Sequence, residues 1–383
     1  MKRIICAVTM LALCGCAVPS GDVLAYRANM DKRTYVMLSE EAAKASIGYV
    51  EGAIEDDSVV SPIGFSLCLG AVAVNSACPE VALSRLGLSE EGYKPLLDCL
   101  NYQDGESALR STAFAQLIHS DGSLHYVEGR RQQMMEEFGI SSIESSVGSY
   151  ENDALDLMEI CLGKRIPLPS LDGVDFSTDL ALVYSALRLK DSVREMNSEQ
   201  LSFHSVDGET LSLEGYAGRR SGEIYLETDS YKALKLVLDN TSLCLFLPDE
   251  GEYASFDLGE AYVRLLNESE LVEADVQVPY FSLETEADLT DQGKAVKEGA
   301  GAMGKLFVEP LESVTTKQRC RFEFDSRGVE GEQVTVDVSV PTSGPPTPAP
   351  EPREVVFHAD RPFYFVSSFI GIPLFAGLYS GAK

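Results

Sequence analysis

The residues most able to do chemistry are scattered along the chain instead of forming a known catalytic motif. The four histidines have no spacing typical of metal ligands, so we expect no metal site; they are His119, His125, His204 and His358. There is no Gly-x-Ser-x-Gly elbow and no ordered Ser/His/Asp set, and hydrolase chemistry therefore has no support in the sequence. We predict that the protein is not an enzyme and uses no cofactor.

One glycine-rich stretch fits a nucleotide-binding pattern. Residues 299–304 match G-x-G-x-x-G, whose glycines can let a pyrophosphate approach a helix N-terminus. Such a site requires a buried strand directly before the glycines, whereas residues 291–298 are mostly polar and charged. We interpret the stretch as a loop that precedes Leu306 and Phe307.

The composition indicates one large acidic domain. The chain has 383 residues, 45% of them apolar, which is enough to bury a large core. Its formal net charge of −29 disfavours a polyanionic partner, and we expect no nucleic-acid binding.

The first residues are typical of an exported protein. Lys2 and Arg3 precede the apolar run 4–13, which suits a signal-peptide core. The run ends in Leu13-Cys14-Gly15-Cys16, which resembles the bacterial lipobox and implies a signal peptide over 1–15, lipid attachment at Cys16 and a tether over 16–30. An ordinary secretion signal that is cleaved nearby is the alternative.

The later cysteines lie in settings that favour burial as free thiols. Cys68, Cys244 and Cys320 stand in apolar or alternating runs, where a thiol commonly serves as a small hydrophobe. We predict no defined disulfide framework.

The elements that could position a functional segment lie between residues 320 and 379. Residues 321–325 alternate polar and aromatic types, which predicts a strand, and Gly328 follows at a point where the chain can turn. Valines alternate with polar residues over 334–340, which predicts a second strand able to join a sheet. Six prolines over 341–352 then predict an exposed, extended segment, and two apolar runs at 361–365 and 373–379 predict a closing hairpin.

Two further elements stand out upstream. Ser61 and Pro62 form a helix-start signal before residues 63–77, which are apolar almost all round and predict a buried helix. Residues 180–190 predict a long buried strand.

This ordered series resembles the serpin family over residues 31–383. The matching motifs include Ser61-Pro62 at the central helix, the strand 180–190, Leu247-Pro248 and the Val-x-x-Pro-x-Phe pattern from Val276 to Phe281. The resemblance implies a single α+β domain with a large, mainly antiparallel central sheet, additional sheets, about eight or nine helices and an exposed reactive loop near the C-terminus, with hinge and loop over 326–356.

The resemblance also implies a trap for a serine or cysteine protease, which cleaves the loop before the loop inserts into the sheet. Counting from Gly328 places the reactive bond between Thr342 and Ser343, with Arg353-Glu354 as the second choice. The hinge would comprise Gly328, Val329, Glu330, Gly331, Glu332, Gln333, Val334 and Thr335, and the sheet-opening region Ser61, Pro62, Gly64 and Ser185. Gly64 and Ser185 stand where most members have Ser and Asn.

The hinge departs from the family pattern in ways that keep a second hypothesis open. Alternation places Val329, Gly331, Gln333, Thr335 and Asp337 on the inserting face, with the other valines facing away. Burying a polar group without a partner costs roughly 2–7 kcal/mol, so Gln333 and Asp337 count against insertion. The alternative is a non-inhibitory serpin-like surface protein. In either case we expect a monomer, exported, and either held at the membrane of the bacterial cell envelope by its lipid or released outside the cell.

Overall fold

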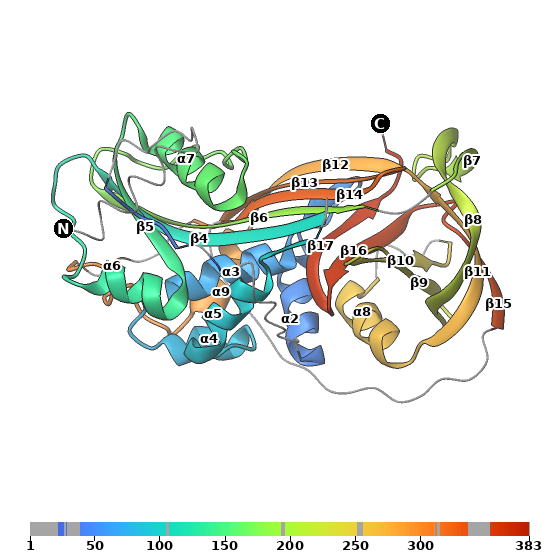
Figure 1. Cartoon of the computed structure of the whole chain (residues 1–383), viewed down its shortest axis with the longest axis horizontal. Helices are drawn as coiled ribbons and strands as arrows, with labels where there is room; N and C mark the ends of the chain where they lie inside the picture. Colours follow the sequence, from blue (N-terminus) through green and yellow to red (C-terminus); the bar gives the residue numbers. More distant parts are fainter. Residues whose placement is uncertain are drawn as a thin grey trace.

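Two large sheets and the helices around them organise the chain (Figure 1). The computed structural model describes residues 22–26, 28, 39–104, 107–192, 196–250, 256–309, 311, 315–335 and 353–382. Among these residues, no helix is both long and apolar enough to cross a membrane.

The first sheet, called the central sheet below, is antiparallel except between β4 and β5. In spatial order its strands are β1 (Val23–Leu24), β5 (Ile140–Ser146), β4 (Ser107–His119), β6 (Leu180–Ser192), β14 (Gly328–Thr335), β13 (Lys317–Asp325) and β12 (Phe281–Asp288), with β3 (Tyr102–Asp104) paired to β4.

The second sheet lies at the other end of the molecule (Figure 1). Its order is β15 (Arg353–His358), β11 (Glu270–Pro279), β8 (Thr210–Glu227), β9 (Tyr231–Val237), β10 (Ser242–Pro248), β16 (Phe363–Phe369), β17 (Ile372–Tyr379) and β2 (Ser58–Val60), with β7 (Ser198–His204) beside β8. The antiparallel pair β16 and β17 confirms the predicted closing hairpin.

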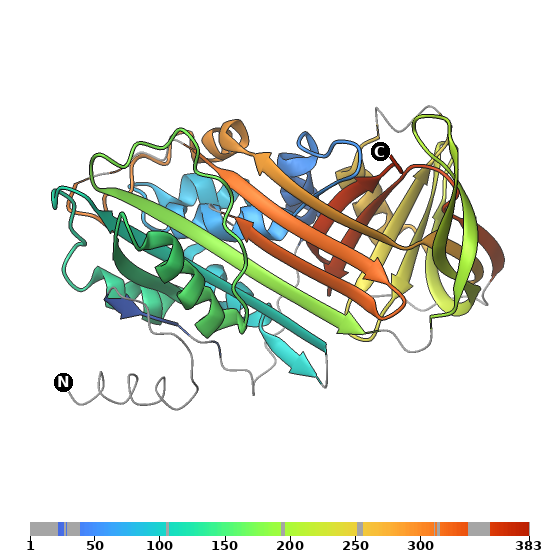
Figure 2. The ribbon, with the colours of Figure 1, turned by 90° about the horizontal axis from the view of Figure 1, so that it is seen from above.

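Eight α-helices are present in the described part of the chain. They are α2 (Glu40–Glu51), α3 (Pro62–Ala73), α4 (Pro79–Arg85), α5 (Glu90–Cys99), α6 (Arg130–Gln133), α7 (Tyr150–Leu162), α8 (Leu258–Asn267) and α9 (Thr290–Lys297), and α6 continues as a π-helical turn over Met134–Phe138. Figures 1 and 2 show α7 on one face of the central sheet and α3 on the other, here named the α7 face and the α3 face.

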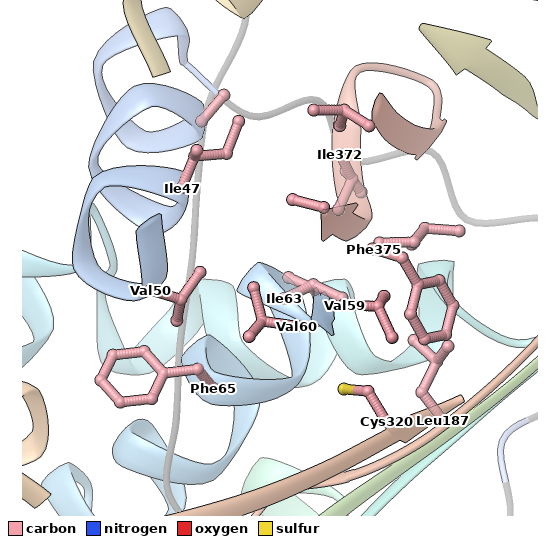
Figure 3. Close-up of a cluster of buried hydrophobic side chains, with 14 of the residues drawn as sticks. Ile47, Val50, Val59, Val60, Ile63, Phe65, Leu187, Cys320, Ile372 and Phe375 are labelled. Atoms are coloured by element: carbon pink, nitrogen blue, oxygen red, sulfur yellow. The ribbon is translucent and has the colours of Figure 1, made fainter. Parts of the chain in front are cut away.

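Helix α3 is the predicted buried helix. Ser61 caps it by accepting a hydrogen bond from the Gly64 amide at 3.0 Å, and Pro62 occupies the first turn, where its missing N–H is not needed. Every residue of α3 is buried. Its side chains meet those of α2, β2, β6, β13 and β17 in one apolar cluster, part of which Figure 3 shows.

The proposed tether needs a correction at residues 22–26. Val23 and Leu24 pair with Ile143 and Ser142 of β5, and the Tyr26 hydroxyl donates to Asp98 at 2.5 Å. These bonds extend the edge of the central sheet by one short strand, so the folded body begins before residue 31. Residues 1–21, which include Cys16, lie outside the described part.

The predicted reactive loop also needs a correction at both of its ends. Its first part, Gly328–Thr335, is strand β14, because the neighbouring strands satisfy its backbone on both sides. The strand predicted for 334–340 therefore begins earlier than expected. Arg353 and Glu354 belong to β15, which pairs with β11.

Candidate functional site

Strand β14 lies between β6 and β13 and is antiparallel to both (Figure 2). On one side Gly328 faces Ser192 and Thr335 faces Ser185; on the other side the same two residues face Asp325 and Gln318. All eight predicted hinge residues are therefore brought together in the middle of the central sheet, where they form one strand.

The side chains of β14 alternate between the two faces as the sequence predicts. Val329, Gly331 and Gln333 point to the α3 face, where all three are buried. Val334 points to the α7 face and packs among Phe114, Tyr184 and Leu157. The register thus places both apolar side chains of the strand in apolar surroundings.

Gly64 and Gln333 fit together because Gly64 lacks a side chain. A Cβ atom built on Gly64 would lie 2.2 Å from the Gln333 side-chain carbon Cδ, far inside van der Waals contact. The glycine at this position therefore makes room in α3 for a long hinge side chain. The absence of the usual serine at position 64 is thus accompanied by a long side chain, Gln333, on β14.

A second close contact involves Gly331. A Cβ atom at Gly331 would lie 2.6 Å from the Phe375 ring, which belongs to the cluster in Figure 3. Only glycine fits at this point without movement of the core.

The predicted sheet-opening residues form a hydrogen-bonded network beneath β14. The Ser61 hydroxyl donates to the Leu374 carbonyl oxygen at 2.6 Å, and the Ser185 hydroxyl donates to the Gly64 carbonyl oxygen at 2.8 Å. The Gln318 side chain accepts from the Ser61 amide at 2.7 Å and donates to the Ser61 carbonyl at 3.0 Å. Helix α3 is thereby tied to β6 and to β13, the two strands that flank β14.

On the α7 face, the charged hinge side chains meet a lysine. Lys164, directly after α7, forms an ion pair with Glu332 and lies 3.8 Å from a carboxylate oxygen of Glu330. The Glu332 side chain is only 9% exposed, against 43% for Glu330. The more buried of the two acidic hinge residues, Glu332, is therefore the one that is paired more closely.

The described residues of this site offer neither a reactive thiol nor a cluster of metal ligands. Cys320 lies opposite Gln333, and burial raises the pKa of its thiol well above the ordinary value, so it stays protonated. Among the described residues, no group of three or more His, Cys, Asp or Glu side chains could hold a metal ion. The arrangement holds β14 as an internal strand of the central sheet.

Comparisons with known proteins bear on the fold of the chain. A scan against protein-family models finds no match, and a search of curated proteins finds none. Among solved structures, the native state of the thermophilic serpin Tengpin matches with a TM-score of 0.72 and 15% identity, over 93% of this chain and 97% of that one. The chain has the serpin fold.

Two further serpins show the range of similar structures. Cleaved Serpin 42Da matches with a TM-score of 0.69 and 17% identity, over 90% of this chain and 98% of that one. The complex of thyroxine-binding globulin with thyroxine matches with a TM-score of 0.68 and 14% identity, over 88% and 98%. The predicted α+β serpin architecture is thus confirmed.

The structure describes only one of the two candidate reactive bonds, Arg353–Glu354. Thr342 and Ser343 lie outside the described residues. Arg353 opens β15, where its guanidinium lies 3.1 Å from Glu227 and 3.3 Å from Glu270. Because Arg353 is paired in a strand, its backbone is less available to a protease than that of an extended loop.

One departure from the family sequence has a structural explanation, and one possible compensation is excluded. The serpin resemblance places a glycine where this chain has Asp191. The Asp191 carboxylate accepts hydrogen bonds from the Asn240 and Thr241 amides at 3.0 and 2.8 Å and so holds the turn between β9 and β10. Ser66 does not replace the lost serine, since its hydroxyl is buried and has no hydrogen-bond partner in the described structure.

Sequence reasoning did not find several residues of the site. Lys164, Arg188, Gln318 and Arg321 were not singled out, because their roles depend on strand register between distant segments. The only signal available was the charge of Glu330 and Glu332, which demands partners if the hinge is to be buried.

Proposed function

We propose that this protein inhibits serine or cysteine endopeptidases by inserting its cleaved loop into the central sheet. The observation that carries the proposal is β14 itself, which has the hinge residues paired on both sides between β6 and β13. A sheet that holds this strand in an apolar, close-fitting site has the means to bind the loop of its own chain.

The proposed reaction begins with attack on the Thr342–Ser343 bond. The protease nucleophile bonds to the Thr342 carbonyl carbon, the bond to the Ser343 nitrogen breaks, and that nitrogen leaves with a proton. The residues joined to Gly328 are then free to continue the strand. Strand β6 extends past the last pair, Thr335 with Ser185, to Leu180, and so offers more backbone for such an extension.

A protease panel tests the proposal. Inhibition predicts a covalent complex that survives denaturant, and mass spectrometry of the released C-terminal peptide gives the cleaved bond. Thr342→Arg should create a complex with a trypsin-like protease, whereas Arg353→Ala should leave complex formation unchanged. Cleavage of the loop without a complex, for every protease tested, would reject inhibition.

A second function is favoured by one feature of β14. The strand is already in the sheet of an uncut chain, so this part of the loop needs no cleavage to insert. That suits a non-inhibitory surface protein whose remaining loop serves as a recognition arm. Thermal melting before and after loop cleavage distinguishes the two functions, because further insertion would raise the melting temperature and a fixed sheet would not change it.

For its location, we propose a lipid-anchored monomer at the bacterial cell envelope. The support is the lipobox-like Leu13-Cys14-Gly15-Cys16, with Cys16 as the acylated residue. Since Val23 and Leu24 are docked on β5, the part of the chain able to act as a tether is shorter than 16–30.

A further inference from the structure

We infer that Glu332 sets the register of the inserted strand by fitting into a row of cations on the α7 face of the central sheet. The inference deepens the proposed function. It rests on one part of that proposal, the entry of β14 into the central sheet. Inhibition of a protease is not required for it to hold.

The row is defined by the pairing of four strands, β4, β6, β14 and β13. Glu332 faces Arg188 of β6 on one side and Arg321 of β13 on the other. Arg188 in turn faces Arg110 of β4. Directly opposed residues have Cβ atoms about 5 Å apart, so Glu332 is the one acidic member of the row between Arg110 and Arg321. Lys164 covers the same carboxylate from the end of α7.

Without the glutamate, Arg188 would have a cation, Arg110, on one side in the row and no carboxylate on the other. Burial and the neighbouring Arg188 both lower the pKa of Arg110, which indicates that the cations already disfavour one another. One Arg188 nitrogen donates to the Leu162 carbonyl oxygen at 3.4 Å, at the C-terminal end of α7, where a cation is stabilised by the helix dipole. Arg321 is also paired with Glu323 at 2.9 Å and faces Glu284 of β12, so the carboxylate of Glu332 chiefly offsets the positive charges of Arg188 and Arg110.

The neighbouring positions along β14 make other registers of the strand unfavourable. Val334 lies in the apolar cluster with Phe114 and Tyr184. If β14 slid two residues deeper, Glu332 would enter that cluster, where an ionised carboxylate has a large desolvation penalty. If it slid two residues back, Val334 would lie between Arg188 and Arg321. A shift of one residue would reverse the two faces of the strand.

Hydrogen exchange of the full-length, uncut chain, without any protease, tests the inference. Glu332→Gln keeps the shape and removes the charge, and it should speed exchange of the β14 amides about tenfold. Glu330→Gln is the matched control: it lies on the same face, is more exposed, and should change the same rates by less than about twofold. Amides of β8 and β11 report whether each variant is folded.

A charge-reversal variant tests whether the whole row of cations, and not only the Lys164–Glu332 ion pair, favours a carboxylate at position 332. In the double variant Lys164→Glu/Glu332→Lys, the pair is reversed but the new lysine lies between two arginines. We expect exchange in β14 to remain fast. Restoration of the original rates, or equal effects of Glu332→Gln and Glu330→Gln, would overturn the inference. Because only exchange is measured, a protein that inhibits no protease could still confirm it.

Discussion

Gly64 has no side chain at the point where Gln333 reaches the core beneath the central sheet. The Gln333 side chain fills the space that the missing side chain of Gly64 leaves, so the two unusual residues are compatible with each other. Each of them alone departs from the serpin pattern. Together they indicate that the hinge of this chain is fitted to its own sheet.

At the residue scale, Gly64→Ser should weaken the binding of β14. Its Cβ atom would overlap the Gln333 side chain, and overpacking of this kind costs typically about 1–3 kcal/mol. The expected result is a lower melting temperature and faster exchange of the β14 amides. The added change Gln333→Ala should recover part of the loss.

Gly48→Ala is the control for that substitution. Gly48 lies on the exposed side of α2, and a Cβ atom there meets nothing within 4 Å, so alanine should be neutral or slightly stabilising. A Gly64→Ser variant as stable as Gly48→Ala would contradict the close fit.

Residue types alone could predict only part of this site. Ser61 and Ser185 were found because a helix cap and a strand motif are local patterns. Gln318 and Gln333 were not predicted as partners of Ser61 and Gly64, because their contacts depend on which strands become neighbours. Gln333 was even counted against insertion, since the sequence does not show that a glycine leaves space for it.

At the element scale, the start of β6 is held by one carboxylate. Asp179 accepts hydrogen bonds from the amides of Ser120, Asp121, Gly122 and Leu124 at 2.5, 2.8, 3.0 and 2.9 Å. Burial acts to raise the pKa of Asp179, but the four amides outweigh it and lower the pKa below its usual range.

The lowered pKa gives a pH-dependent prediction. A carboxyl whose pKa is lower in the folded state stabilises the fold above its unfolded pKa of about 3.9, and this stability is lost as the pH falls through the folded pKa. Asp179→Asn should therefore destabilise the chain at pH 7, by on the order of 1 kcal/mol, and by less as the pH falls below about 4.

Denaturant unfolding at several pH values measures this difference. Asp121→Asn serves as the control, because Asp121 is exposed and accepts from one amide, that of Ser123 at 3.1 Å. A difference between Asp179→Asn and the unmodified chain that stays constant down to pH 3 would show that the four amides do not favour the charged form.

The elements with a strong periodic signal were predicted well, and the others were not. Helix α3 and strand β6 lie where their apolar runs place them. Strand β1 was assigned to a tether because two residues carry no periodicity, and the pairing with β5 is a tertiary contact. Strand β14 was predicted to begin six residues later, since its polar residues gave no strand signal outside the sheet.

At the scale of the whole molecule, the N-terminal strand and β15 lie at opposite ends (Figure 1). A lipid at Cys16 could then be no more than about 22 Å from Asp22, because an extended chain spans at most about 3.6 Å per residue. Asp22 is itself held by Arg131 at 2.7 Å. Anchoring would thus keep the β5 end close to the membrane and the β15 end away from it.

The anchoring proposal predicts that Cys16→Ala will move the protein from the membrane fraction to the soluble fraction. Thioether-linked lipid can form only on the cysteine that follows the cleavage site, so Cys14→Ala should leave the protein in the membrane fraction. Fractionation of cells that express each variant measures this. An unchanged distribution for Cys16→Ala would favour an ordinary secretion signal.

The most direct test of the whole account is hydrogen exchange of residues 328–335 in the unmodified, uncut protein. A strand that pairs on both sides should exchange as slowly as β6 and β13, because its amides open only when the sheet opens. We predict that protection in all three strands is comparable. Fast exchange over 328–335, with β6 and β13 still protected, would show that the hinge is not a strand of the central sheet in solution and would contradict the account.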